Sequence, residues 1–188
     1  MKVKVGISNT HAHLTQEQIE ILFGKGFTLT FYRNIRQNDE FVSGQTIDVE
    51  GPKGTLNNVR ILGPAREQAQ VEISLTNARK LGIEAEVRLS ENVYGTPGAK
   101  LIGPEGEVVL DQGIIAAARH LHISPLEAAS MNLKEGQMIC AEVPGPRNLV
   151  FKNIVVRIDQ QYTAELHLDT DEANAAKLEK GDEVEIFI

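Results

Sequence analysis

Residues 11–15 read HAHLT and residues 120–124 read HLHIS, and this repeated motif organises the chain. Each copy has two histidines one residue apart, followed by a Thr or Ser that can cap a helix. Residues 15–18 (TQEQ) and 124–127 (SPLE) fit the capping-box pattern, the second with Pro at the first helical position. We therefore expect a short helix directly after each histidine pair.

Two further blocks follow each motif, in the same order in both halves. Residues 51–62 read GPKGTLNNVRIL and residues 71–81 read VEISLTNARKL. The later counterparts are GPRNLVFKNIVVRI at 145–158 and LHLDTDEANAAKL at 166–178. Aligning the last blocks places Glu72 opposite His167, each ahead of a short Ala-containing segment.

The repeated order of the three blocks predicts an internal duplication. We expect a first lobe over residues 1–90 and a similar second lobe over residues 91–188, with an approximate boundary and the site between the lobes. The first lobe carries His11, His13 and Glu72, and the second carries His120, His122 and His167.

Most of the remaining sequence is typical of β-structure. Short runs that alternate apolar and polar residues are separated by Gly-Pro turns, which favours a barrel or a sandwich. The expected strands are 2–5, 46–50, 56–62, 70–75, 100–103, 107–110, 138–143, 154–158, 164–168 and 184–188. Further short helices are expected over 76–81, 114–119 and 171–178. The fold class is therefore mainly β with short α-helices.

Composition excludes several classes of protein. The net charge of -7 argues against a nucleic-acid binder, which needs clustered Lys and Arg. No segment approaches the apolar length that spans a membrane, and the N-terminus lacks the apolar run of a secretory signal. Cys140 is the single cysteine, so a thiolate metal cluster is excluded. The expected location is the cytoplasm.

All five histidines lie in the repeated blocks, which indicates a metal site. Residues i and i+2 of an extended segment point to the same face, so each pair presents two imidazoles to one point. Neutral imidazole and carboxylate are both good zinc ligands. A single pair would be weak evidence, because a strand histidine is usually solvated or hydrogen-bonded. Two pairs at matching positions favour metal.

The number of candidate ligands favours a catalytic site over a structural one. A closed tetrahedral zinc needs four ligands, whereas this sequence offers six, so we expect two ions or one ion with open positions. Arg66 precedes Glu72 in the same segment and could hold phosphate through two parallel hydrogen bonds. The alternative is a surface arginine paired with Glu67 or another acid.

These blocks resemble the phosphate propanoyltransferase family, the PduL-type phosphotransacylases. The resemblance runs nearly end to end and rests on VGISNTHAHLT at 5–15, NVRILGPAR at 58–66, QVEIS at 70–74, AARHLHISP at 117–125 and LHLDTDEANAA at 166–176. It implies two similar β-barrel domains and an enzyme that interconverts acyl-CoA and phosphate with acyl phosphate and CoA. The acyl group would be propanoyl or acetyl.

The resemblance also implies the site residues. It assigns two zinc ions per chain, one held by the first lobe's three candidate ligands with the coenzyme A sulfur, the other by the second lobe's three with water. Arg66 matches the family's phosphate-binding arginine. The implied chemistry is attack by a zinc-stabilised coenzyme A thiolate on the acyl phosphate carbonyl, while Arg66 offsets the charge on the departing phosphate.

Some members of this family carry an N-terminal extension that packs them inside a bacterial microcompartment. Here the first expected strand begins at Lys2, so we expect that extension to be missing, which argues against microcompartment association. Members often self-associate, so a homo-oligomer is an open alternative to a monomer.

Spacing alone leaves two other functions open. A zinc-dependent hydrolase of an ester, amide or phosphoester would consume acyl phosphate without coenzyme A. A non-catalytic metal-binding protein would hold zinc with filled coordination and turn over no acyl donor.

Overall fold

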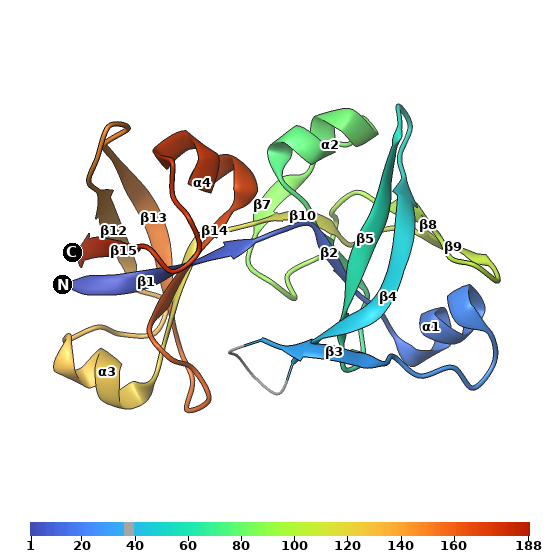
Figure 1. Ribbon diagram of the computed structural model, residues 1–188, viewed down its shortest axis with the longest axis horizontal. Helices are drawn as coiled ribbons and strands as arrows, with labels where there is room; N and C mark the ends of the chain where they lie inside the picture. Colours follow the sequence, from blue (N-terminus) through green and yellow to red (C-terminus); the bar gives the residue numbers. More distant parts are fainter. Residues whose placement is uncertain (36–39) are drawn as a thin grey trace. The chain divides into compact units, whose positions relative to one another are not determined.

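The computed structural model describes residues 1–35 and 40–188 (Figure 1). Contacts divide the described residues into two units. Residues 1–8 and 118–188 form one, which we call the barrel unit, and residues 9–35 and 40–117 form the other, which we call the sheet unit. Strands dominate both units, which confirms the predicted mainly β fold class.

Four short helices lie between the strands of the described residues, and both predicted capping boxes are present. Thr15 caps α1 with Gln18 as its reciprocal partner, and Ser124 caps α3 with Glu127. Asp169 caps α4 in the same way, and Ser74 caps α2 through its hydroxyl alone. The helices are α1 (Gln16–Phe23), α2 (Leu75–Leu81), α3 (Pro125–Ser130) and α4 (Thr170–Ala176).

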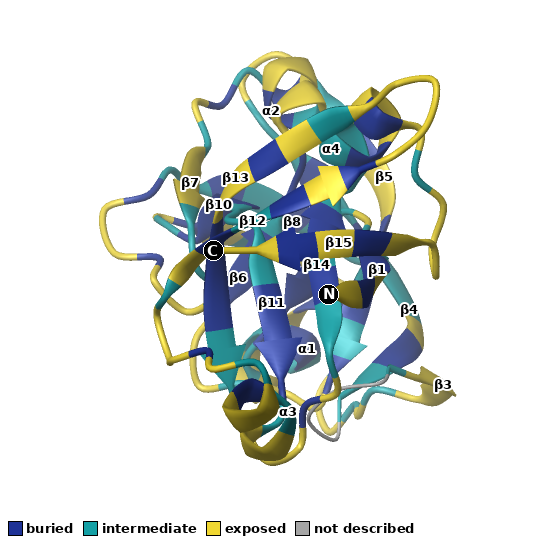
Figure 2. Cartoon of the chain, turned by 90° about the vertical axis from the view of Figure 1, so that its left-hand side faces the viewer, coloured by how far each residue is buried: buried dark blue, intermediate teal, exposed yellow. Residues whose placement is uncertain are grey.

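The barrel unit closes six strands into a barrel in the order β1, β14, β11, β13, β12, β15. Their bounds are β1 (Lys2–Ser8), β11 (His120–Ile123), β12 (Met138–Val143), β13 (Leu149–Ile158), β14 (Glu165–Asp169) and β15 (Glu183–Phe187). Burial alternates along β15, as Figure 2 shows, because successive side chains point inward and outward. Ile154 and Leu166 are fully buried in the interior.

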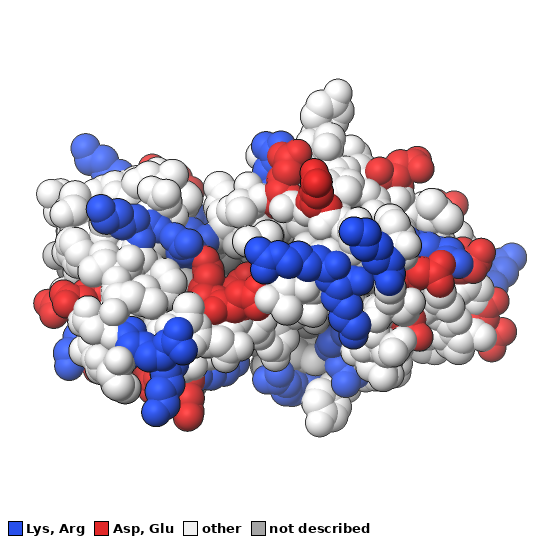
Figure 3. All heavy atoms as spheres, turned by 90° about the horizontal axis from the view of Figure 1, so that it is seen from above, with Lys and Arg blue, Asp and Glu red and all other residues white. Residues whose placement is uncertain are grey.

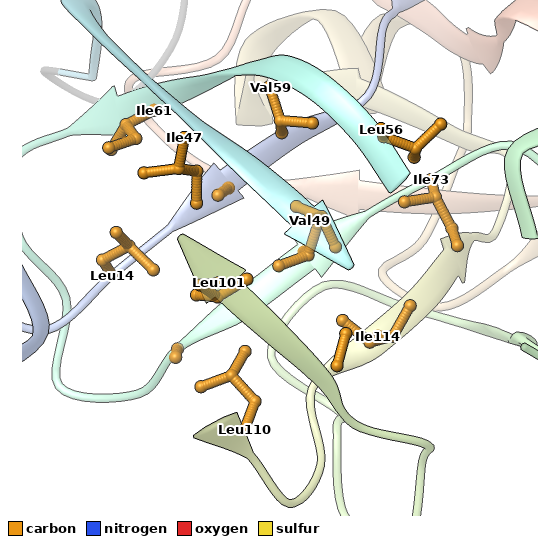
Figure 4. Close-up of a cluster of buried hydrophobic side chains, with 14 of the residues drawn as sticks. Leu14, Ile47, Val49, Leu56, Val59, Ile61, Ile73, Leu101, Leu110 and Ile114 are labelled. Atoms are coloured by element: carbon orange, nitrogen blue, oxygen red, sulfur yellow. The ribbon is translucent and has the colours of Figure 1, made fainter. Parts of the chain in front are cut away.

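The sheet unit contains a sheet of nine strands in the order β7, β10, β6, β2, β5, β4, β8, β9, with β3 paired to β4. They are β2 (His11–His13), β3 (Phe31–Asn34), β4 (Phe41–Glu50), β5 (Thr55–Gly63), β6 (Gln70–Glu72), β7 (Glu86–Arg88), β8 (Ala99–Ile102), β9 (Glu107–Leu110) and β10 (Ile114–Ala117). Leu14, Ile61, Leu101 and Ile114 pack in its core (Figure 4). Burying each such side chain stabilises the fold by about 1.5–3 kcal/mol.

Two expectations from the sequence need correction. One unit is the predicted closed barrel, but the other is an open nine-stranded sheet by its strand order. The helix predicted over 114–119 is wrong, because Ile114–Ala117 forms β10 between β6 and β7. Residues 91–117 group with the sheet unit by their contacts, and the lobe boundary near residue 90 stays a prediction.

Each unit takes in strands from outside its own half of the sequence: β1 joins the barrel unit, and β8, β9 and β10 join the sheet unit. β1 precedes the first histidine pair in the chain but pairs in parallel with β14. β10 precedes the second pair but pairs in parallel with β6. The order of the strands along the chain therefore differs from their grouping into units. No local pattern in the sequence predicts that β1 and β10 pair with strands of the other half.

The two ligand-bearing ladders have the same connectivity. β2 pairs antiparallel with β6 and parallel with β5, and β11 pairs antiparallel with β14 and parallel with β13. Asn58 and Asn153, at matching positions of β5 and β13, share a φ of 57°, a left-handed conformation that asparagine tolerates. These parallels support the interpretation of a duplication, which stays a prediction.

Two observations relate to nucleic-acid binding and to membrane insertion, the functions that the composition argued against. Acidic and basic side chains occur together on the face drawn in Figure 3. Among the described residues, no helix has both the length and the apolar character needed to cross a lipid bilayer.

Candidate metal centres

Two groups of three potential metal ligands come together within the described residues, each group inside one unit. The ligand atoms of each group lie within 4.8 Å of one another. The sheet unit holds His11, His13 and Glu72, and the barrel unit holds His120, His122 and His167. The structure thus gathers the six residues into the two sets that the sequence predicted; metal binding itself stays a prediction.

Strand register explains why these side chains meet. His11 lies opposite Glu72 in the β2–β6 ladder, with Nε2 3.7 Å from Oε2. His120 lies opposite His167 in the β11–β14 ladder, with ring centroids 4.9 Å apart. The second histidine of each pair follows at i+2 on the same face. Three ligands per group therefore follow from two adjacent strands.

The first histidine of each pair is oriented by main chain. Nδ1 of His11 lies 2.7 Å from the carbonyl oxygen of Asn9, and Nδ1 of His120 lies 2.8 Å from that of Ala118. A carbonyl oxygen can only accept a hydrogen bond, so Nδ1 carries the hydrogen and Nε2 carries the lone pair that a metal needs. The same contact, to the carbonyl two residues earlier, therefore sets the same tautomer in both groups.

The second histidine of each pair is buried and neutral. Burial, followed by the charge of His11, lowers the pKa of His13 to about 2. Burial, followed by the charges of His120 and His167, lowers the pKa of His122 strongly. Neutral imidazole is the form that binds metal.

Some ring nitrogens of these buried histidines have no hydrogen-bond partner within the part of the chain that the structure describes. They are Nδ1 of His13 and both ring nitrogens of His122. Buried polar atoms without a partner are rare, and a metal ion is one group that would satisfy them. Imidazole and carboxylate donors suit zinc, so the residues present fit the implied metal. The ring of Tyr162 stacks on His122, with centroids 3.9 Å apart, and holds it in place.

A side chain beside each group ties the histidine strand to the neighbouring helix. In each group, the residue just before the first histidine contacts the third residue of the helix that follows the third ligand. In the sheet unit Asn77 donates to the hydroxyl of Thr10 at 2.8 Å. In the barrel unit Arg119 forms an ion pair with Glu172 and donates to the carbonyl of Lys152 at 2.6 Å. Arg119 therefore has a structural role at this position.

Arg66 lies beside the first group and carries an incompletely paired guanidinium. Its main-chain N–H donates to the carbonyl of Leu14 at 2.9 Å, and its charge contributes to lowering the pKa of His13. Nη2 pairs with Glu40, so the acidic partner is not the Glu67 that the sequence suggested. Nη1 is buried and has no acceptor among the described residues.

Sequence reasoning missed four residues around these groups: Glu40, Gln70, Tyr162 and Glu165. Strand alternation could have found Gln70 and Glu165, because each precedes a third ligand by two residues and shares its face. Glu40 is 26 residues from Arg66, and no sequence signal links the two.

Fold and donor groups together define a small, mainly β protein that presents two sets of side chains able to hold a metal ion. A family model described as phosphate propanoyltransferase matches residues 4–179. The phosphate propanoyltransferase of Thermotoga maritima is 44% identical over 183 residues, which cover 97% of this chain and 87% of the relative. That of Salmonella typhimurium is 43% identical over 175 residues, covering 93% and 83%.

The chain belongs to the phosphate propanoyltransferase family, as the sequence motifs predicted. Members of this family are phosphotransacylases, a class of acyltransferase, so the protein is an enzyme of that class.

Proposed function

We propose that this protein is a zinc-dependent phosphate acyltransferase. It interconverts acyl-CoA and phosphate with acyl phosphate and coenzyme A, the acyl group being propanoyl or acetyl. Family membership supports the reaction class. The observation that carries the metal dependence is a buried, neutral histidine in each group, with at least one ring nitrogen that has no partner among the described residues and lies beside two further donors.

The ligand sets favour two zinc ions per chain, each with room for substrate. One set has two imidazoles and a carboxylate, and the other has three imidazoles. Catalytic zinc sites use three protein ligands of these types and keep a further position open. When bound, zinc would supply a lowered pKa for the coenzyme A thiol and polarisation of the acyl carbonyl.

The chain's own residues bind and orient the reactants. Arg66 offers Nη1 and the remaining edge of its guanidinium to phosphate, and Glu40 fixes the plane of that guanidinium. A planar guanidinium can donate two parallel hydrogen bonds to phosphate oxygens. His13 stays neutral near neutral pH because burial lowers its pKa, so it does not compete with Arg66 for the anion.

The transfer is a single exchange at the acyl carbon. The coenzyme A thiolate attacks the carbonyl of the acyl phosphate, a carbon–sulfur bond forms and the carbon–oxygen bond to phosphate breaks. Phosphate leaves with the bonding electron pair, and Arg66 offsets its charge. In reverse, phosphate held by Arg66 attacks the thioester. No acyl-enzyme intermediate is needed. We also propose that the enzyme works in the cytoplasm.

A thioester assay tests this function directly. Purified protein is given acetyl phosphate or propanoyl phosphate, with and without coenzyme A, and thioester absorbance and free phosphate are followed. We expect thioester and phosphate to appear together only when the thiol is present. Phosphate release at the same rate without coenzyme A would identify a hydrolase and contradict the proposal.

A further inference from the structure

The third ligand of each group has a hydrogen-bonding neighbour two residues earlier in its own strand. Nε2 of Gln70 donates to Oε1 of Glu72 at 2.7 Å. Nε2 of His167 lies 3.0 Å from Oε2 of Glu165. An amide thus faces a carboxylate in one group, and a carboxylate faces an imidazole in the other. The amide can donate a hydrogen bond to the carboxylate of Glu72, and the carboxylate can accept one from the imidazole of His167.

These two neighbours occupy the same place in both ladders. Gln70 lies opposite His13 in the β2–β6 pairing, and Glu165 lies opposite His122 in the β11–β14 pairing. Each therefore lies next to the buried histidine of its group and beside its third ligand. Matching position with complementary chemistry favours a common role over chance polar contacts.

The orientation of the Gln70 amide is fixed by its surroundings. Oε1 accepts from the main-chain N–H of Glu91 at 2.6 Å, and that N–H can only donate. Nε2 must therefore face Glu72, and it also donates to the hydroxyl of Ser90 at 2.9 Å. With 2% of its surface exposed, Gln70 has little freedom to turn. The carboxylate of Glu72 is consequently held by a fixed donor.

Glu165 is similarly confined. Its side chain is 13% exposed, and Gly6 of β1 lies beneath it: a Cβ at Gly6 would come within 2.9 Å of Oε2. The absence of a side chain at Gly6 makes space for the carboxylate beside His167. The carboxylate can then fix the orientation of the imidazole ring, as it does in carboxylate–histidine–metal arrangements.

We propose that Gln70 and Glu165 are positioning residues, each of which aims the third ligand of its own metal group. The inference rests on the proposed function and deepens it. Loss of such an outer partner typically costs about 10–100-fold in metal affinity. Because each residue contacts one group, replacing it should weaken the binding of one of the two zinc ions and leave the affinity for the other unchanged.

Two nearly isosteric variants separate this role from a general loss of packing. Gln70→Glu keeps the acceptor for the Glu91 N–H but turns the donor facing Glu72 into a second carboxylate. Glu165→Gln keeps the shape beside His167 and removes the charge. Glu17→Gln, at an exposed position of α1, is the matched control. Zinc affinity is measured by chelator competition, and the cobalt-substituted proteins are compared by absorption spectroscopy.

We expect wild type and Glu17→Gln to hold two zinc ions of unchanged affinity. Gln70→Glu and Glu165→Gln should each hold one ion as tightly as wild type and one about 10–100-fold more weakly. Each should also change only part of the cobalt spectrum, while the melting temperature of the metal-free protein stays near that of wild type. Unchanged affinities in the variants, or equal weakening of both ions, would overturn the positioning role alone. A wild type that holds no zinc would overturn the proposed function as well.

Discussion

His11 and Glu72 face each other across the β2–β6 ladder, with the imidazole Nε2 3.7 Å from the carboxylate Oε2. Main-chain hydrogen bonds between the strands place the two residues opposite each other, so the pairing of the strands does not depend on a bound ion. His120 and His167 have the same ladder relationship in the barrel unit. Each group can therefore lose one ligand side chain while its strands stay paired.

Removing a first-position histidine should cost one zinc ion and the activity. We expect His11→Ala and His120→Ala each to lower the zinc content from two ions per chain to one and to reduce thioester formation by about 100-fold or more. Metal analysis and the thioester assay check this. Lys25→Ala, at an exposed position, is the control. Full activity in either histidine variant would show that its group is dispensable.

Replacing Arg66 by Lys should affect phosphate specifically. Lysine keeps the charge but cannot donate two parallel hydrogen bonds from a planar group. In the direction that consumes phosphate, we expect KM for phosphate to rise by about 10-fold or more and KM for acyl-CoA to change little. Arg79→Lys, exposed on α2, should behave as wild type. An equal rise in both KM values would argue against phosphate binding by Arg66.

Adding a methyl group at Gly6 should disturb the second metal group without unfolding the barrel. The new Cβ would lie 2.9 Å from Oε2 of Glu165 and 3.2 Å from Nε2 of His167. Both atoms end side chains that can turn aside, so the fold can adjust while the ligand is displaced. For Gly6→Ala we expect weaker binding of one zinc ion with a melting temperature close to wild type. Two tightly bound ions would contradict this geometry.

The metal-free protein should lose stability as pH falls from about 7.5 to 5.5. Burial lowers the pKa of His13 to about 2 and also lowers that of His122, whereas an unfolded histidine titrates near 6.5. Below about pH 6.5 the unfolded chain therefore binds more protons than the folded protein does. The free energy of unfolding consequently decreases as the pH is lowered. Urea denaturation at several pH values measures this slope. His13→Gln should have a shallower slope, and an identical slope would contradict the assignment.

Local signals in the sequence predicted much of the fold. Capping boxes located α1 and α3, and alternation located β12 over Met138–Val143. The apolar run at Ile114–Ala117 was misread as a helix, since a short apolar segment has no periodicity that distinguishes a buried strand from a helix. The pairing of β1 with β14 joins residues far apart in the chain, which propensity cannot report.

The candidate site was also predicted only in part, because the sequence reports local patterns but not contacts between distant residues. The repeated H-x-H motif indicated four of the candidate ligands, and alignment of the third repeated blocks added Glu72 and His167. Gln70 and Glu165 each lie two residues before a third ligand in the same strand, so alternation could have suggested them, but the hydrogen-bonding contacts themselves are seen only in the structure. The ion pair of Arg66 with Glu40 likewise depends on long-range packing.

Metal depletion followed by reconstitution tests the central claim most directly. Purified protein is analysed for zinc, stripped with a chelator, assayed for thioester formation from acetyl phosphate and coenzyme A, and assayed again after stepwise addition of zinc. We predict two zinc ions per chain at the start, loss of activity on stripping, and recovery that is complete at two equivalents. Undiminished turnover by protein that contains no metal would contradict the account.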